Sequence, residues 1–267
     1  MKIVFAAARS SPGVTTAMLA CASVWPGRLL LVEASEDGGA LAARFGLRVE
    51  PGLTTFAAAS RHAATGDDAG GRLVDHVQPL PGTDRILALV APASMEPARV
   101  LLRTAAARLA ELLDGLTDDM LIDAGRLSPT PLAGPLLAEA DRLVLVVRPR
   151  LEELTALAHR LPHLATFGAR PEVLLVGDRP YGPGEVADTL GVDVLGVLAH
   201  DVHAAEALAA AGPVRRLGRS PLLRSATRIV DQLTVGRPVP QPDEHTSSHN
   251  THDAAGSGRR RLVRGRS

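Results

Sequence analysis

The chain has 267 residues, 46% of them hydrophobic, which is enough to bury the core of one large α/β domain. A formal net charge of zero and an aromatic content of 2% argue against general attraction to nucleic acid and against stacking on single-stranded bases. The single cysteine, Cys21, excludes an intrachain disulfide and is typical of a cytoplasmic protein with a buried thiol.

Short, nearly continuous apolar runs recur along the chain and predict strands buried on both faces of a parallel sheet. These runs are residues 2–7, 29–33, 85–91, 120–123, 142–147, 172–176 and 193–198. Alanine-rich stretches with helical spacing alternate with them, at residues 15–24, 38–46, 97–114, 151–165, 184–190, 202–211 and 220–235. This alternation predicts a doubly wound α/β domain over residues 1–235, with a mostly parallel sheet flanked by helices.

Two helix starts have a specific signal. Pro97 suits the first position of the helix at 97–114, because that position needs no N–H partner. Asp201 is interpreted as the N-cap of the helix that follows it, rather than as a catalytic acid.

The composition changes near Gly236. Residues 236–267 are polar, rich in Pro, Gly and Ser, and lack periodicity, which predicts a disordered tail. Its last segment, "GRRRLVRGRS", would contact DNA or an anionic membrane surface, or would simply be solvated. The "RPR" at 148–150 is interpreted as a strand-exit loop, with a DNA- or partner-binding face as the alternative.

The stretch "AARSSPGVTT", residues 7–16, fits the frame of a phosphate-binding loop, G-x-x-x-x-G-K-[ST]. In this frame Ala8 replaces the first glycine, Gly13 is the second glycine, Val14 replaces the lysine and Thr15 supplies the hydroxyl. Such loops hold phosphates by backbone N–H groups at a helix N-terminus, although Pro12 removes one donor. The candidate nucleotide-binding residues of the loop are Arg9, Ser10, Ser11, Gly13, Val14, Thr15 and Thr16.

The loop resembles the deviant Walker A loop of the MinD/ParA family, K-G-G-V-G-K-T-T, with Arg9 and Val14 at the positions of the two lysines. Four later segments resemble the same family in the same order, and the resemblance therefore runs over residues 1–235. They are the second strand and switch (28–46), the Walker B strand (118–126), the next strand and helix (141–157) and the base-side strands (174–208). This resemblance implies a P-loop NTPase-like fold.

The resemblance also implies roles for particular residues. Asp123 would help Thr15 to hold magnesium, and Glu33 and Ser35 fall at the family's two acidic positions, of which the second orients the attacking water. Asp178 lies where the family has an asparagine that reads adenine. The implied cofactors are ATP and Mg²⁺.

The charge that phosphoryl transfer needs is missing from these positions. Val14 carries no cation, Ser35 is a poor substitute for a carboxylate, and Lys2, the only lysine, lies at the far end of the first strand. We therefore predict weak or no ATP binding and slow or absent hydrolysis. One alternative is an active ATPase in which Arg9 replaces the lysine and Glu33 or Glu36 the aspartate. The other is a nucleotide-free interaction module in which the Val14 side chain fills the phosphate space.

The cellular role follows from the resemblance alone. It implies a homodimer that encloses nucleotide and a cytoplasmic positioning or scaffold factor, peripheral at the membrane or nucleoid. The cargo would be a chromosome-partition complex, a septum component, or a polar pilus or secretion machine. The residues favour none of these cargoes over the others.

Overall fold

A computed structural model of the chain describes residues 1–10, 12–63, 72–168, 170–210 and 218–235. The tail predicted at 236–267 and the loop residue Ser11 lie outside this part of the chain. Unless stated otherwise, the elements below are those of the described residues.

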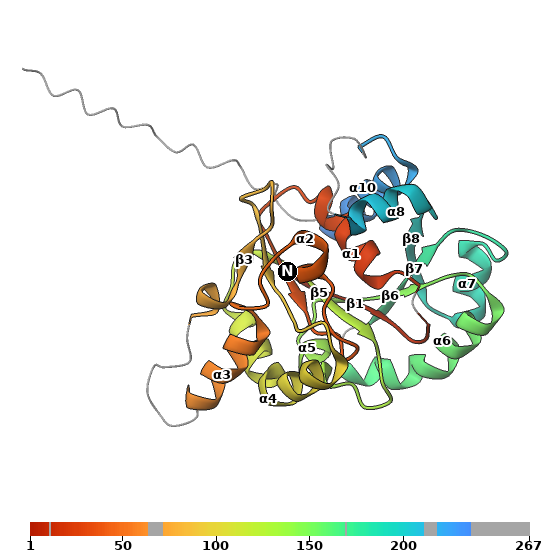
Figure 1. The fold of residues 1–267 in the computed structure, drawn as a ribbon. Coiled ribbons are helices and arrows are strands. Elements are labelled where there is room, and N and C mark those ends of the chain that lie inside the picture. Colours follow the sequence, from red (N-terminus) through yellow and green to blue (C-terminus); the bar gives the residue numbers. More distant parts are fainter. Residues whose placement is uncertain (11, 64–71, 169, 211–217, 236–267) are drawn as a thin grey trace, which may run out of the picture. The chain divides into compact units, whose positions relative to one another are not determined.

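The central element is an eight-stranded sheet in the order β3-β4-β2-β5-β1-β6-β7-β8 (Figure 1). Neighbouring strands run parallel, except that β3 is antiparallel to β4. The strands are β1 (Lys2–Ala7), β2 (Leu29–Glu33), β3 (Gln78–Pro79), β4 (Ile86–Leu89), β5 (Asp119–Arg126), β6 (Arg142–Val147), β7 (Pro171–Val176) and β8 (Asp193–Leu198). All seven predicted apolar runs are strands, so the prediction of a mostly parallel sheet is confirmed.

Helices cover both faces of the sheet, as expected for a doubly wound domain. Figure 1 shows α1, α8 and α10 together on one face and α3, α4 and α6 on the other. The helices on the first face are α1 (Val14–Ser23), α2 (Leu41–Phe45), α8 (Val202–Ala209) and α10 (Pro221–Thr234). The second comprises α3 (Leu53–Ala63), α4 (Met95–Asp114), α5 (Gly134–Ala138), α6 (Leu151–Leu164) and α7 (Pro183–Leu190), with short 3₁₀ turns at η1 (Leu73–His76) and η2 (Ala165–Phe167).

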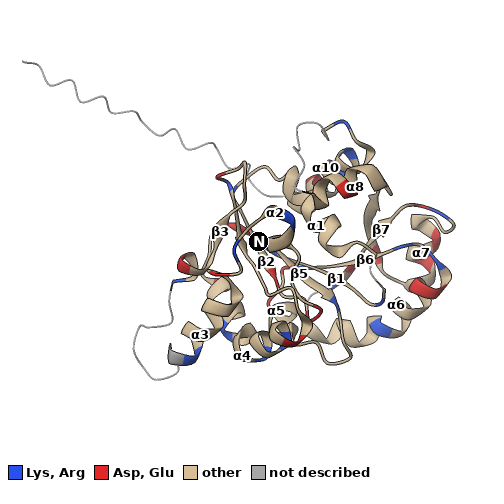
Figure 2. Ribbon diagram, viewed as in Figure 1, with Lys and Arg blue, Asp and Glu red and all other residues tan. Residues whose placement is uncertain are grey.

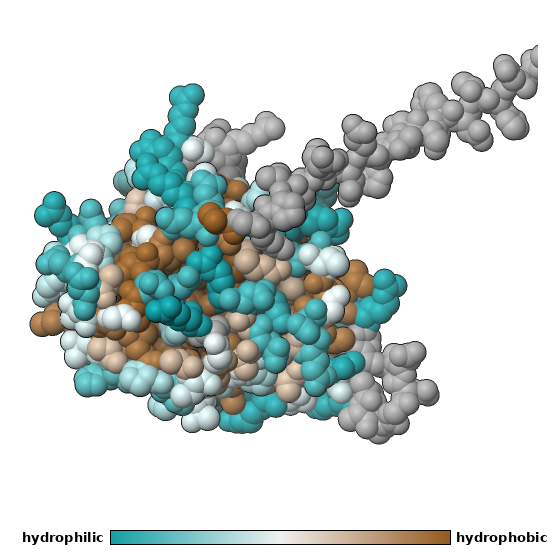
Figure 3. Space-filling model, turned by 180° about the vertical axis from the view of Figure 1, so that it is seen from behind, coloured by the Kyte–Doolittle hydropathy of each residue, from teal (hydrophilic) through white to brown (hydrophobic). Residues whose placement is uncertain are grey.

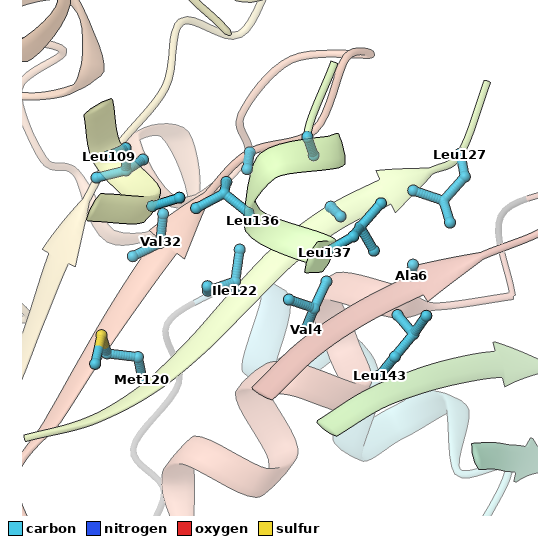
Figure 4. Packing of buried hydrophobic residues seen from close by; sticks show 14 of the residues in the cluster. Val4, Ala6, Val32, Leu109, Met120, Ile122, Leu127, Leu136, Leu137 and Leu143 are labelled. Carbon is cyan, nitrogen blue, oxygen red and sulfur yellow. The ribbon is translucent and has the colours of Figure 1, made fainter. Parts of the chain in front are cut away.

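Two apolar clusters, one on each face, form the core. Along β1 the side chains alternate between them: Ile3 and Phe5 belong to the cluster under α1, and Val4 and Ala6 to the opposite one. All four are fully buried, as expected for a strand that is covered by helices on both faces. Figure 4 shows the second cluster, where Leu137 of α5 lies over β1 and β5.

Helix α4 differs from the prediction at its start. It begins at Met95, so Pro97 is its third residue and not its first. Proline is still tolerated there, because the N–H groups of the first helical turn have no intrahelical partner. The expectation that Pro97 marks the first helical position is therefore wrong by two residues.

Helix α2 is shorter than the predicted stretch 38–46. It is limited to Leu41–Phe45 because the preceding loop packs closely on the segment after β4. Gly38 has a φ of +102°, and a Cβ there would lie 2.3 Å from the carbonyl oxygen of Ala93. This close approach requires glycine and an irregular backbone.

Hydrophobic side chains also reach the surface. Figure 3 views the molecule from behind and shows hydrophobic residues gathered in the middle of that face, among hydrophilic ones. The exposed large hydrophobic residues include Val100 of α4 and Leu151 of α6. In the part of the chain that the structure describes, no helix combines the length and hydropathy needed to cross a bilayer.

Cys21 lies on α1 and is fully buried, as predicted. Burial raises the pKa of its thiol to about 12. Because the thiolate is the reactive form, we expect a thiol reagent to leave the native protein unmodified at neutral pH and to label one thiol after denaturation. A labelling time course in native and denaturing buffer checks this, and rapid stoichiometric labelling of the native protein would contradict it.

Candidate functional site

The predicted loop connects β1 to α1, in the strand–loop–helix context that a phosphate-binding loop requires. Gly13 takes the N-cap position of α1 with a φ of 105°, and its carbonyl oxygen accepts the first helical hydrogen bond from the Ala17 N–H, at 2.8 Å. Ser10 also has a positive φ, of 60°, and is exposed. The loop therefore turns sharply and directs the N-terminus of α1 toward the carboxyl edge of the sheet.

Val14 packs into the core beneath α1. It is 7% exposed and belongs to the apolar cluster that contains Phe5 and Met18. Among the described residues that line the cavity beside the loop, Val14 does not occur. The interaction-module alternative expected this side chain to fill the phosphate space, whereas it points into the core.

Thr15 and Asp123, the two residues predicted to hold magnesium, are brought together. The Thr15 hydroxyl donates a hydrogen bond to Asp123 Oδ2 at 2.5 Å, and the Gly125 N–H donates to Oδ1 at 2.9 Å. The contact arises because β5 lies beside β1, with Asp123 paired to Phe5. A hydroxyl and a carboxylate are hard oxygen donors, which suit Mg²⁺ completed by water and phosphate oxygens.

Asp123 is a buried carboxyl whose charge is only partly compensated. Burial raises its pKa, while the hydrogen bonds from Thr15 and Gly125 and the positive charge of Arg44 lower it, with a net rise. Arg44 lies on α2, and its Nη1 is buried without a hydrogen-bond partner among the described residues. A buried carboxylate without a full set of partners fits a site that a cation completes. Thr15 and Asp123 are the residues that would hold Mg²⁺ here.

Glu33 ends β2 next to Asp123 and is fully used by the fold. Its Oε1 accepts hydrogen bonds from the N–H groups of Ala40 and Leu41, and its Oε2 accepts one from Ala91 at 2.9 Å. Burial raises the pKa of Glu33, and these three hydrogen bonds partly offset the rise. The carboxylate thus fixes the start of α2 and the segment after β4 to the end of β2. The role that the resemblance implies for Glu33, at the first of the family's two acidic positions, stays a prediction.

Ser35 lies against the Walker B strand. A Cβ on Gly125, whose φ is +59°, would lie 2.3 Å from Ser35 Oγ, so the two residues are in close contact. Ser35 Oγ accepts a hydrogen bond from the Asp37 N–H at 3.2 Å. Ser35 thus contacts the residue two positions after Asp123 in the sequence, and it offers a hydroxyl instead of a carboxylate.

Glu36, the substitute base of the active-ATPase alternative, is bound elsewhere. Its Oε1 accepts hydrogen bonds from the Ser128 hydroxyl at 2.8 Å and the Leu132 N–H at 2.9 Å, and its Oε2 pairs with Arg99 at 3.5 Å. These contacts tie the loop after β2 to the segment after β5. Glu36 therefore takes part in the packing of these two segments, with one carboxylate oxygen hydrogen-bonded and the other paired with Arg99.

A cavity of about 280 Å³ opens beside the loop. It is lined by Pro12, Gly13 and Thr16 of the loop and first helical turn, and by residues 198–202, which run from the end of β8 to the start of α8. Asp201 caps α8 as predicted, since its carboxylate accepts a hydrogen bond from the Ala204 N–H at 3.1 Å.

The other two candidate residues follow strands β1 and β7 at the carboxyl edge of the sheet. Arg9 is exposed and makes no ion pair of 4 Å or less with a described residue, and Asp178 follows Gly177 at the end of β7. Neither occurs among the described lining residues. Arg148, which the sequence analysis assigned to a strand-exit loop, does line the cavity. Its position just after a strand that ends at the carboxyl edge is the signal that would have found it.

The parallel sheet, the loop between β1 and α1 and the Thr15–Asp123 contact define a P-loop NTPase-like protein. No protein-family model and no curated protein matches the sequence. Solved structures do: a ParA family ATPase from Chlorobium tepidum TLS superposes with a TM-score of 0.69 at 20% identity, over 86% of this chain and 96% of that chain.

Two structures of MinD proteins match equally well. The septum site-determining protein MinD from Pyrococcus horikoshii OT3, complexed with Mg-ADP, gives a TM-score of 0.68 at 16% identity, over 87% of this chain and 95% of that one. A chain of the MinC:MinD cell division protein complex from Aquifex aeolicus gives 0.68 at 12% identity, over 91% and 98%. The chain therefore has the fold of the MinD/ParA ATPases.

Proposed function

We propose that this chain is a MinD/ParA-like nucleotide-binding protein that hydrolyses ATP slowly or not at all and acts as a dimeric positioning or scaffold factor in the cytoplasm, peripheral at membrane or nucleoid. The observation that carries the proposal is the Thr15–Asp123 hydrogen bond beside a buried Val14. The parts that would hold phosphate and magnesium are present. The loop cation and the water-orienting carboxylate are absent from their positions.

The chemistry of the site supports this division. Backbone N–H groups and a helix N-terminus bind phosphate without a lysine, although more weakly. Stabilising the transition state demands charge placed at the transferred phosphoryl group, and neither Val14 nor Ser35 carries any. The similar ParA structure is named as an ATPase, and the Pyrococcus horikoshii MinD structure is a septum site-determining protein complexed with Mg-ADP. If ATP is bound but not hydrolysed, the nucleotide would serve as a ligand that stabilises the protein in its positioning role.

Calorimetry of the full chain with ATP and ADP, with and without Mg²⁺, tests the proposal. We expect a Kd of the order of 100 µM, about −5.5 kcal/mol, and phosphate release close to the uncatalysed rate. Thr15→Ala should remove the Mg²⁺-dependent part of the affinity, a change of about tenfold, because the metal loses its hydroxyl ligand.

The two alternatives predict different results. Turnover that depends on Mg²⁺ and disappears in Thr15→Ala would establish the active ATPase in place of the proposal. No binding at millimolar nucleotide would favour the interaction module. An apolar groove of about 430 Å³ between α6 and α7, lined by Leu151, Leu154 and Tyr181 among others, is the observation that favours a partner-binding surface in that case.

A further inference from the structure

The cavity beside the loop is lined by a cationic side chain, Arg148, whereas the lysine position of the loop holds Val14. We propose that the Arg148 guanidinium binds the phosphate of the ligand in this cavity and takes the place of the missing loop lysine. This inference rests on the proposed function, and it assigns to the site a residue outside the loop.

The sheet order brings Arg148 to the loop. Strand β6 lies directly beside β1 and runs parallel to it, with Leu145 paired to Ala6. Continued by three residues, this register places Arg148 level with Arg9, in the loop. The residue that follows β6 is therefore held next to the residues that follow β1, although 139 positions separate them in the sequence.

The backbone of Arg148 is fixed. Its N–H donates a hydrogen bond to Glu153 Oε2 at 3.0 Å, and Glu153 is itself buried. Pro149 follows and restricts Arg148 to the extended region of the backbone. A side chain that starts from a fixed backbone loses less entropy when it binds, so the cavity wall is suited to holding a ligand group.

The guanidinium of Arg148 has an unsatisfied nitrogen. Among the described residues, Arg148 Nε is buried without a hydrogen-bond partner, and Arg148 forms no ion pair of 4 Å or less. An unsatisfied buried N–H of a charged group is costly unless a ligand satisfies it. The same cavity is lined by Gly13 and Thr16 at the start of α1, and a helix N-terminus favours an anion.

Phosphate is the anion that matches these donors. A guanidinium presents parallel N–H groups that fit two phosphate oxygens, and the Gly13–Thr16 turn presents backbone N–H groups from the other side. Glu206 of α8 also lines the cavity and is the competing partner for Arg148. Removing its charge should therefore strengthen binding of phosphate.

The test measures binding of MgADP, inorganic pyrophosphate and adenosine to the full chain by calorimetry. Arg148→Ala should weaken MgADP and pyrophosphate binding by about tenfold or more, the loss expected for a charge-assisted hydrogen bond. Arg148→Lys should lose less, Glu206→Gln should bind MgADP more tightly, and any adenosine binding should not change. Arg150→Ala, an exposed arginine two residues away, is the matched control and should bind like the wild type.

The possible failures are distinguishable. If the wild type binds MgADP and Arg148→Ala binds it equally well, the inference is wrong and the proposed function stands. If pyrophosphate binds through Arg148 but ADP does not bind, the inference stands and the proposed function is wrong. If the wild type binds neither at millimolar concentration, both are wrong. Thermal melting of each variant shows whether it is folded. If Arg148→Ala does not fold, the binding affinity of Arg148→Lys for MgADP and pyrophosphate is the test instead.

Discussion

Replacing Glu33 with alanine is expected to lower the free energy of unfolding by about 3–5 kcal/mol. The carboxylate accepts hydrogen bonds from the N–H groups of Ala40, Leu41 and Ala91, all of them beside the buried end of β2. Alanine would leave three backbone donors without a partner in a place that water does not reach. The start of α2 and the segment after β4 would then lose their shared anchor.

Two further variants make this result specific. Glu33→Gln keeps one accepting oxygen and turns an amide N–H₂ toward a donor, so its cost should be smaller than that of alanine but still clear. Asp37→Ala removes an exposed carboxylate that pairs with Arg126 at 3.2 Å, and it should cost less than about 1 kcal/mol. Urea unfolding followed by circular dichroism measures all three. A Glu33→Ala variant as stable as Asp37→Ala would show that Glu33 is free for magnesium chemistry.

The pattern of the sheet could be predicted because it depends on local features. The apolar runs at 29–33 and 142–147 predict strands from their own composition, without knowledge of the neighbouring strands. The "GVTT" segment likewise predicts the start of a helix from its local sequence. When parallel strands are each followed by a helix, the carboxyl ends of all the strands lie at the same edge of the sheet. The meeting of Thr15 with Asp123 follows from these features and from the resemblance to the MinD/ParA family.

Other features could not be predicted from the sequence, because the position and burial of these residues depend on contacts between distant segments of the chain. Helices α3 and α5 lie in stretches without a strong start signal, and Phe56 and Leu137 are buried only because other helices cover them. Arg148 reaches the loop only because β6 is the neighbour of β1, and no local pattern in the sequence states this strand order. Glu33 was assigned by resemblance to a catalytic position, while its partners come from two other segments of the chain.

Burial of the Asp123 carboxyl predicts an effect on stability that is opposite in sign to that of Glu33. Figure 2 shows acidic residues of β2 and β5 together in the interior, near the middle of the sheet. Burial raises the pKa of Asp123 above the ordinary value of 3.8, so its ionised form is disfavoured in the folded chain. A group whose folded pKa is raised stabilises the fold below its unfolded pKa, and this contribution is lost as the pH rises through the folded pKa.

Asp123→Asn should therefore stabilise the ligand-free protein at neutral pH by about 1 kcal/mol. The asparagine oxygen can still accept from the Gly125 N–H, and its amide can donate to the Thr15 hydroxyl, while no buried charge remains. The same change should abolish the effect of Mg²⁺ on nucleotide binding, because the carboxylate ligand is gone. Asp118→Asn, which changes a half-buried carboxylate one residue before β5 that pairs with Arg28 at 3.5 Å, should alter neither property appreciably.

Thermal melting and calorimetry over a range of pH measure both effects. In the wild type, Mg²⁺-dependent binding should weaken as the pH falls through the raised pKa of Asp123, since the metal binds only the ionised carboxyl. In the wild type, the free energy of unfolding should decrease as the pH rises through the pKa of Asp123, and in Asp123→Asn this decrease should be absent. Because the pKa of Glu33 is also raised, its contribution is present in both proteins and cancels in the difference between them. A variant that is destabilised, or that keeps its response to Mg²⁺, would mean that Asp123 serves the fold and that this site does not bind a metal.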